Sequence, residues 1–469
     1  MEDRLPAIGG ALRTAARRWG TPLYVTDLAT IDAAAEEVRA AFPDPWIRQY
    51  SLKSNDLPAI VTRIARHGFG ANVVSRGEWS LATRAGVPGH RVTMEGIGKT
   101  DADLRAVVRA AASGTALHWI AIESADEAAA LAAFATRAGL GHDHPTAAHD
   151  GPGAAAAPRA GEDIHAHAHA HHEEHRDRRH RVARLDVLLR LNPAVRPETF
   201  HGLAVGAAGS KFGLADDEIA AALEAGGGPG GPLRWRGIHL HVGSQLGAVD
   251  AWRDAIRRAL ALVALMRGTL PHFDTLDVGG GFPVAIDGRD DSLPGPARFA
   301  AEIPALIEAI PHDRRPARLA VEPGRFLVAR AGWLVARVLH VRPDRGEQGA
   351  PMVVLDAGMT ELIRPALYGA HHRIVALSSL GRPLDPGAPS PMHMATSVEG
   401  PVCESTDAFG VERLPPLRRG DIVAIRDAGA YAASLSSRYN GRPRPPEVLL
   451  DPDGGLSLAR RRGSLDSLA

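Results

Sequence analysis

The stretch WIRQYSLKS, residues 46–54, is a strand-like run that ends in small and polar residues, and a helix-like segment follows it. This order is typical of a βα unit. The same pattern recurs in seven further runs: ANVVS (71–75), RVTME (91–95), HWIAIES (118–124), DVLLRLN (186–192), GIHLHVGS (237–244), TLDVGGG (275–281) and RLAVEPG (318–324). Eight such units predict a TIM-type (β/α)8 barrel, whose active site lies at the C-terminal ends of its strands. A doubly wound sheet would need fewer units and a switch point, so the pattern favours the barrel.

Lys53, near the end of the first run, is one of three lysines in a chain with 54 Lys and Arg residues. A lysine amine can lose its proton and react, whereas a guanidinium stays charged, so Lys53 is a candidate for amine chemistry. The alternative is an ordinary surface lysine. Lys211, in SKFG, follows Gly-rich sequence outside the predicted strands and is expected to be structural. Lys99, in GIGKT, lacks the full spacing of a phosphate-binding P-loop.

The pattern changes after residue 325 to Val-rich runs separated by Pro and Gly turns, without comparable helical segments. The runs VARVLHV, APMVVLD and DIVAIRD indicate an antiparallel β-barrel or sandwich domain. The early run TPLYVTD, residues 21–27, is expected to join this domain. The sequence therefore predicts a barrel domain at residues 28–325, a β domain formed by residues 1–27 and 326–458, and a flexible tail at residues 459–469.

A low-complexity insertion interrupts the predicted barrel at residues 141–182, and it holds 10 of the 22 histidines of the chain. Its Gly, Pro, Ala and charged residues are unsuited to a core, which predicts a disordered surface segment. His-rich tracts can bind transition metals. We expect any such binding to be incidental, and no metal is predicted at the functional site.

Composition limits the partners that the chain is expected to have. Its 54 acidic and 54 basic residues balance, so charge gives no reason to expect nucleic acid or an anionic membrane. No run of about 18 apolar residues appears, and the first residues lack the basic and apolar parts of a signal peptide. Cys403 is the single cysteine, which excludes an intrachain disulfide and indicates a reducing compartment. We expect a soluble cytoplasmic protein with a small-molecule ligand.

Two Gly-containing motifs fall at the ends of the last two predicted strands. DVGGGFP, residues 277–283, places three consecutive glycines where backbone N–H groups can approach an anionic oxygen. EPGR, residues 322–325, adds a carboxylate, another glycine and a guanidinium. The loops after the seventh and eighth strands of a TIM barrel are a frequent phosphate site. With Lys53 and Glu322, this cradle meets the needs of pyridoxal phosphate: a Schiff-base lysine, an anion clamp and an acid for the pyridine nitrogen.

These motifs resemble those of the fold-type III pyridoxal-phosphate-dependent decarboxylases over about residues 20–450. The matching stretches, in the order of the family, are YSLKSN, SKFG, HVGSQ, DVGGGF, EPGRFLVARAG, LDAGMTELIRPALYGAHH, GPVCESTD and DAGAYAASLSSRYNGRPRPPEVLL. The resemblance implies pyridoxal 5'-phosphate as the cofactor and a homodimer with shared active sites. One departure is Asn72, in ANVVS, where the family usually has an aspartate.

The resemblance also implies roles for individual residues. Lys53 would form the Schiff base, His241 would stack on the cofactor ring, and Glu322 would keep the pyridine nitrogen protonated. Cys403 and Glu404 would enter the site from the second subunit. The expected catalytic residues are Lys53, His241 and Cys403. The expected cofactor-binding residues are Lys53, His241, Ser244, Gly279, Gly280, Gly281, Glu322, Gly324, Arg325 and Tyr431. The expected substrate-binding residues are Arg325, Arg364, Tyr368, Glu404 and Tyr431.

The expected substrate carries charges at both ends. Arg325, Arg364 and Tyr368 would hold its distal carboxylate, and Glu404 its distal ammonium; Arg364 and Tyr368 share a face only if a helix starts in IRPALY. The resemblance thus implies decarboxylation of meso-2,6-diaminopimelate to L-lysine and carbon dioxide, the last step of lysine biosynthesis. The alternatives are a decarboxylase of ornithine, arginine or carboxynorspermidine, a racemase with the same barrel and cofactor, and a non-catalytic regulatory homologue that binds pyridoxal phosphate.

Overall fold

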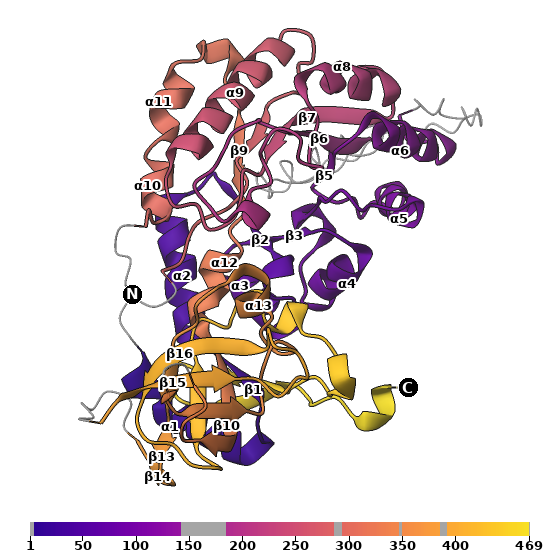
Figure 1. The fold of residues 1–469 in the computed structure, drawn as a ribbon. Coiled ribbons are helices and arrows are strands. Elements are labelled where there is room, and N and C mark those ends of the chain that lie inside the picture. Colours follow the sequence, from indigo (N-terminus) through magenta and orange to yellow (C-terminus); the bar gives the residue numbers. More distant parts are fainter. Residues whose placement is uncertain (1–3, 142–183, 286–292, 347–348, 385–391, 469) are drawn as a thin grey trace, which may run out of the picture.

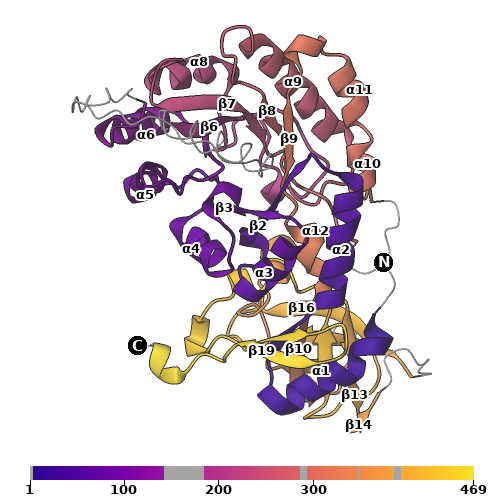
Figure 2. The same cartoon turned by 180° about the vertical axis from the view of Figure 1, so that it is seen from behind.

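A computed structural model describes residues 4–141, 184–285, 293–346, 349–384 and 392–468. Eight parallel strands form a closed barrel, which occupies the upper part of Figures 1 and 2. These strands are β2 (Ile47–Ser51), β3 (Gly70–Val73), β4 (Val92–Met94), β5 (Trp119–Ile122), β6 (Leu185–Leu191), β7 (Leu233–Leu240), β8 (Thr275–Asp277) and β9 (Arg318–Val321). Each overlaps one of the eight runs expected from the sequence, so the prediction of a TIM-type barrel is confirmed. The insertion expected at residues 141–182 lies, apart from Gly141, outside the described residues.

The barrel closes where its last strand meets its first. β9 pairs in parallel with β2, with Ile47 opposite Ala320 and Arg48 opposite Val321. Inside the barrel, Trp119, Leu188 and Ala320 form a small buried cluster that fills the space between the strands. Because all eight strands are parallel, their C-terminal ends lie at the same end of the barrel.

Several helices that follow barrel strands begin at a residue whose hydroxyl caps their first turn. Ser75 accepts a hydrogen bond from the N–H of Glu78, Ser124 from that of Glu127, and Thr100 forms a capping box with Asp103. The described α-helices are α1 (Leu5–Trp19), α2 (Leu28–Ala41), α3 (Pro58–Arg66), α4 (Arg76–Arg84), α5 (Asp101–Ala112), α6 (Ala125–Arg137), α8 (Asp216–Ala225), α9 (Asp250–Met266), α10 (Pro296–Ala300), α11 (Ile303–Glu308), α12 (Arg325–Val328) and α13 (Arg364–Tyr368). Of the helices in these ranges, none is long and apolar enough to cross a membrane.

A second sheet of nine strands lies below the barrel in Figure 1. Its main path runs β16-β15-β11-β10-β1-β18-β19, and β17 joins it by pairing with β10 and β12. The strands are β1 (Leu23–Asp27), β10 (Gly332–Arg342), β11 (Met352–Leu355), β12 (Ile374–Ala376), β15 (Met394–Glu399), β16 (Ala408–Leu414), β17 (Ile422–Ile425), β18 (Glu447–Leu450) and β19 (Leu456–Arg460). A short pair, β13 (Ser378–Ser379) and β14 (Arg382–Pro383), stands apart from this sheet.

The second domain is a β structure, as expected, but its sheet is mixed rather than wholly antiparallel. β1 pairs with both β10 and β18, so the run TPLYVTD contributes a strand to this sheet. The pairs β1–β18 and β11–β15 are parallel. Such pairs join strands that are distant in sequence, which a Val-rich pattern of short runs does not reveal.

The two faces of the second sheet have different cores. Leu23 and Val25 of β1 pack with Ile8 and Leu12 of α1, which lies along the sheet in Figure 2. Tyr24 points to the opposite face and belongs to a separate core with residues of β10, β11 and β17. This alternation along one strand is the period of two expected for a sheet with both faces buried.

The end of the chain remains attached to the second sheet. β19 extends to Arg460, and Arg462 donates a hydrogen bond of 2.9 Å to the carbonyl of Pro22. The sheet therefore continues past residue 458, where the sequence analysis placed the start of a flexible tail. We propose that the barrel domain spans residues 28–325 and that residues 1–27 and those from 326 onward form the second domain.

A short segment before Tyr431 joins the two domains. The side-chain amide of Asn55, in the barrel domain, donates to the carbonyl of Gly429 at 3.0 Å. The N–H of Tyr431 donates to the carbonyl of Ser54 at 2.8 Å. These bonds fix the second domain against the turn that carries Lys53.

Gly429→Ala tests how closely this segment packs against residues 328–332. A Cβ at Gly429 would clash with the carbonyl oxygen of Val328, and backbone surrounds it. We expect the substitution to lower the free energy of unfolding by about 1–3 kcal/mol, measured by denaturant-induced unfolding. Gly230→Ala is the matched control, because a Cβ there meets nothing within 4 Å. Equal stability of the two variants would contradict the close approach at Gly429.

Candidate active site

A cavity of about 390 Å³ lies at the C-terminal ends of the barrel strands. A narrower pocket adjoins it and adds Gly281, Glu322 and Gly324 to the lining. The two spaces share five residues that the sequence analysis selected: Lys53, His241, Ser244, Arg325 and Tyr431. The structure thus brings most of the predicted cofactor site together around one space.

Lys53 reaches the cavity from a tight turn. β2 ends at Ser51, and Leu52–Ser54 form a 3₁₀ turn in which Lys53 is half-buried. The hydroxyl of Ser54 donates to the carbonyl of Ser51 at 2.8 Å, which holds the turn closed. Of the three lysines, all of which the structure describes, Lys53 alone lines the cavity. Lys99 is buried in an ion pair, with its Nζ 2.9 Å from Oε1 of Glu127, and the Lys211 residue is exposed.

His241 directly follows β7 and lines both parts of the cavity. Its burial, and then the charges of Lys53 and Arg190, lower the pKa of His241 well below its usual value. The ring is therefore neutral at physiological pH. Its Nδ1 is buried and has no hydrogen-bond partner among the described residues, so the imidazole is a flat, uncharged surface beside the lysine.

The loop after β8 approaches the neighbouring backbone too closely for side chains. Gly279 has φ +67°, and a Cβ there would clash with the carbonyl oxygen of Leu240. At Gly281, with φ +104°, a Cβ would lie 2.5 Å from the carbonyl oxygen of Gly243. Only glycine fits both conformation and space here. The result is a backbone-lined wall of the kind that binds phosphate.

Arg325 supplies the positive charge beside this wall. Its Nη2 and Nε donate to the hydroxyl of Ser244 at 3.0 and 3.2 Å. Its Nη1 is buried without a partner in the described part of the chain. Burial lowers the pKa of Arg325, because a guanidinium loses hydration there. An anionic oxygen at this point would satisfy the free donor and the buried charge together.

Tyr431 closes the cavity from the second domain. The guanidinium of Arg325 lies 4.7 Å from the centre of the Tyr431 ring. A cation placed above an aromatic face in this way is attracted to it. Tyr431 has φ +56°, which is costly for a non-glycine residue. The N–H bond to Ser54 holds it in place, so the second domain completes a site that the barrel begins.

Arg364 and Tyr368 both belong to the short helix α13, which begins at Arg364. A helix starting in IRPALY is the condition for these two residues to share a face. Tyr368 lines the cavity. Arg364 is buried, and its Nη1 donates to Nε2 of His372 at 2.8 Å. His372 in turn donates from Nδ1 to the carbonyl of Arg426 at 2.9 Å. Because a guanidinium only donates, this chain of bonds requires a neutral His372 ring.

Arg364 lines neither space, but its buried guanidinium adds to the positive charge of Arg325 on this side of the cavity. Burial, and then the charge of Arg325, lower the pKa of Arg364 to about 10. Burial and the charge of Arg364 lower the pKa of His372 to about 3, so it adds no charge. A bound carboxylate would relieve the repulsion between Arg325 and Arg364.

Cys403 and Glu404 stand apart from the other predicted residues. Both are exposed, and neither lines the cavity of its own chain. Glu404 accepts a hydrogen bond of 2.6 Å from the hydroxyl of Tyr439. The buried carboxylate of Asp407 fixes their loop by accepting from the N–H groups of Val402 at 2.6 Å and Met359 at 2.5 Å.

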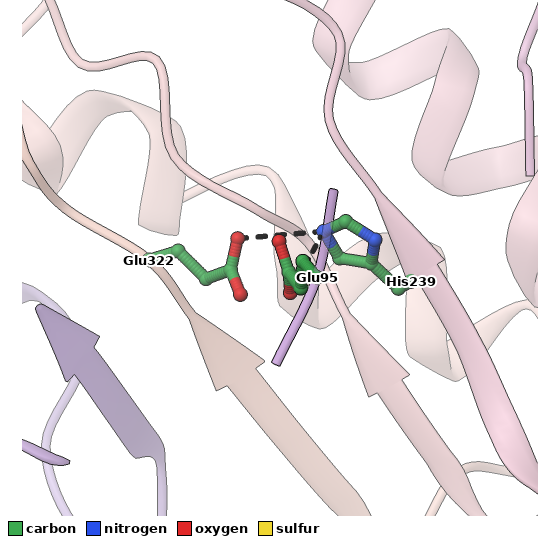
Figure 3. Close-up of side chains that lie close together, drawn as sticks. All are labelled: Glu95, His239 and Glu322. Carbon is green, nitrogen blue, oxygen red and sulfur yellow. Dashed lines mark ion pairs between the residues drawn. The ribbon is translucent and has the colours of Figure 1, made fainter. Parts of the chain in front are cut away.

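Sequence reasoning missed a buried polar cluster behind Glu322. Figure 3 shows the carboxylates of Glu95 and Glu322 side by side, with the ring of His239 facing both. Nε2 of His239 lies 3.2 Å from Oε1 of Glu95 and 3.4 Å from Oε2 of Glu322. Two signals were present in the sequence: RVTME ends a strand in a carboxylate, and the spacing His-x-His in GIHLHVGS puts residues 239 and 241 on one face.

The fold and the cavity are typical of a barrel enzyme that uses pyridoxal phosphate. The family described as pyridoxal-dependent decarboxylase, C-terminal sheet domain, matches residues 23–429. The chain is 30% identical to the diaminopimelate decarboxylase of Aquifex aeolicus, covering 98% of this chain and 93% of the relative. It is 34% identical to that of Deinococcus radiodurans, covering 97% of each. The chain therefore belongs to the pyridoxal-dependent decarboxylase family, and its cofactor is pyridoxal 5'-phosphate.

Solved structures agree with this assignment. The crystal structure of diaminopimelate decarboxylase from Helicobacter pylori, complexed with L-lysine, matches with a TM-score of 0.79 at 25% sequence identity. The match covers 97% of this chain and 98% of the other. The match therefore extends over both the barrel and the second sheet.

Replacing the cavity lysine tests its predicted role. Lys53→Ala should lower turnover on the order of a thousandfold or more, because no other lysine lines the described cavity. Borohydride reduction of the wild-type holoenzyme, followed by peptide mapping, should place the cofactor on Lys53. Lys211→Ala, which alters an exposed lysine, is the control and should keep both properties. A reduced adduct on Lys99 or Lys211 would overturn the assignment.

Proposed function

We propose that this protein decarboxylates meso-2,6-diaminopimelate to L-lysine and carbon dioxide, the last step of lysine biosynthesis. The observation that carries the proposal is its near-full-length likeness to the diaminopimelate decarboxylases of A. aeolicus and D. radiodurans. The cavity supports it, because reactive and anion-binding groups occur in the same space. Lys53 lies at its cofactor end, and Arg325 and Tyr368 belong to the same lining.

The residues around the narrow pocket fit the cofactor. We propose that Lys53 forms the Schiff base and that His241 offers its neutral ring as a stacking surface. Glu322 would hold a proton on the pyridine nitrogen. The bound cofactor supplies an electron sink for the carbanion that remains when carbon dioxide departs. The proposed phosphate ligands are Ser244, Gly279, Gly280, Gly281, Gly324 and Arg325, and Tyr431 would contact both cofactor and substrate.

The positive end of the cavity fits the distal carboxylate of the substrate. Arg325 and Arg364 are buried guanidinium groups whose mutual repulsion an anion would relieve. Tyr368, on the same helix as Arg364, adds a hydroxyl at the cavity wall. His372 fixes the direction of Arg364 through the 2.8 Å bond. Ornithine and L-lysine have no second carboxylate, so they would leave these charges unsatisfied.

Glu404 and Cys403 are proposed to act across a homodimer. Both are exposed on a loop that Asp407 holds rigidly. A second subunit that presents this loop would bring a carboxylate for the distal ammonium and a thiol to the active site. Cys403 is a free cysteine, and the chain has no other, as is usual in a reducing compartment. We therefore propose a cytoplasmic homodimer with shared active sites.

Arg364→Ala tests the carboxylate site. Loss of one partner of a buried charge pair costs about 3–5 kcal/mol, so kcat/KM for diaminopimelate should fall on the order of a hundredfold to a thousandfold. Cofactor content should stay unchanged. Arg373→Ala, at an exposed position nearby, is the matched control. An unchanged kcat/KM would rule out Arg364 as the carboxylate ligand, and efficient turnover of ornithine would overturn the proposed substrate.

Subunit mixing tests the shared site. Lys53→Ala and Glu404→Gln homodimers should each be nearly inactive. In a random mixture half of the dimers are mixed, and each of these has one intact site, so activity should recover to about a quarter of wild type. Mixing Lys53→Ala with Lys53→Ala, Glu404→Gln double-variant protein is the control and should recover nothing. No recovery after verified subunit exchange would show that each site is complete within one chain.

A further inference from the structure

Three buried carboxyl groups and one imidazole meet at the bottom of the cofactor pocket. Glu95, Asp277 and Glu322 follow or end the strands β4, β8 and β9, and His239 belongs to β7. Their exposed fractions are 4% for both glutamates and 0% for Asp277 and His239. The nearest oxygen and nitrogen atoms of Glu95, His239 and Glu322 all lie within 4.8 Å of one another (Figure 3). Negative charges on both Glu95 and Glu322 at such spacing, away from water, would repel strongly.

The surrounding groups compensate this repulsion only in part. Burial lowers the pKa of His239 to about 4, so its ring is neutral. Arg190 faces the cluster, but its Nη1 is committed to Glu123 at 2.6 Å. The charge of Lys53 also lowers the pKa of His239. In the proposed function this amine binds the cofactor and so does not pair with the cluster. Burial, followed by the charge of Glu322, raises the pKa of Glu95 to about 8.

The hydrogen bonds distinguish Glu322 from Glu95. The side-chain amide of Asn72 donates to Oε1 of Glu322, so a donor stands where the family usually has another carboxylate. Asp277 accepts from the N–H of Gly279 at 2.9 Å, and burial together with the charges of Glu322 and Glu95 raises its pKa well above the usual value. Oε1 of Glu95 has no hydrogen-bond donor among the described residues. Glu322 is thus the carboxylate that the surroundings stabilise.

We propose that Glu95 is a positioning residue that stays protonated and donates its carboxylic-acid hydrogen to Glu322, so that a single negative charge faces the ring nitrogen of the cofactor. This inference rests on the proposed role of Glu322 but not on the identity of the substrate. The Glu95 acid and the Asn72 amide hold Glu322 from two sides, and the carboxylate keeps a lone pair directed at the pocket. With an ionised Glu95, the pocket would carry a second negative charge, although one negative charge is enough to pair with the protonated ring nitrogen.

Carbon-13 NMR of the cofactor-free protein, labelled at the glutamate carboxyl carbons, reads the protonation of Glu95 directly. The carboxyl resonance that is present in the wild-type spectrum and missing from the spectrum of Glu95→Gln is assigned to Glu95. We expect the chemical shift of a protonated carboxyl group at neutral pH and a titration midpoint near 8. An ionised Glu95 at neutral pH would overturn the proposal. This measurement needs neither cofactor nor substrate, so its failure is separate from failure of the proposed function.

Two substitutions at Glu95 distinguish a hydrogen-bond donor from a negative charge. Glu95→Gln keeps an N–H donor without a charge, whereas Glu95→Ala removes the donor. Cofactor affinity is measured by titrating the apoenzyme with pyridoxal phosphate. It should be at least about tenfold tighter in Glu95→Gln than in Glu95→Ala, because the alanine variant leaves the buried carboxylate of Glu322 without one of its hydrogen-bond donors. Equal affinities of the two variants would overturn the proposal. So would one divalent metal ion per wild-type chain that Glu95→Gln fails to retain.

Discussion

Pairing of β9 with β2 is the contact on which the site depends. It brings Glu322, which follows β9, beside the turn that carries Lys53, although the two residues lie far apart in sequence. The hydroxyl of Ser51, at the end of β2, also donates to the carbonyl of Glu322 at 3.3 Å. An open sheet would separate the amine of Lys53 from the carboxylate of Glu322. The two groups could then not contact the same cofactor molecule, as we propose they do. Closure of the barrel is therefore a condition for chemistry as well as for stability.

Burial gives the charged residues of the cavity their significance. At one end Arg325 and Arg364 lie close together in a region of low dielectric, and at the other end three carboxyl groups converge. Such groups are costly to bury alone. The two ends have opposite demands: the arginines call for an anion, whereas the carboxyl cluster reduces its charge by retaining protons. The proposed substrate carboxylate would meet the first demand, and the proposed protonated ring nitrogen of the cofactor would meet the second.

The sequence predicted the barrel well because buried parallel strands appear as short apolar runs with a regular helix spacing between them. It also predicted residues that line the cavity, since Lys53, His241 and Glu322 each lie in the last part of such a run. The second domain was predicted less fully. β1 lies between β10, to which it is antiparallel, and β18, to which it is parallel; this position depends on contacts across the whole chain, and the local pattern contains no sign of it. The cluster of Glu95 and His239 was missed for the same reason, because a polar residue in a strand does not reveal which strand faces it. The roles of Cys403 and Glu404 concern a second chain and stay predictions.

The central place of β1 has a consequence for the order in which the polypeptide matures on the ribosome. β1 ends at Asp27, but its neighbours β10 and β18 begin only at Gly332 and Glu447. All eight barrel strands are synthesised in between, so the barrel can close while β1 still has both edges unpaired. Such an edge is exposed to wrong pairing until its partners emerge. Tyr431, which completes the cavity, is translated between those two partners. A nascent chain that stalls before β18 therefore has a closed barrel and an open, aggregation-prone sheet edge, so we expect slow translation of the last part of this chain to lower its yield in the cell.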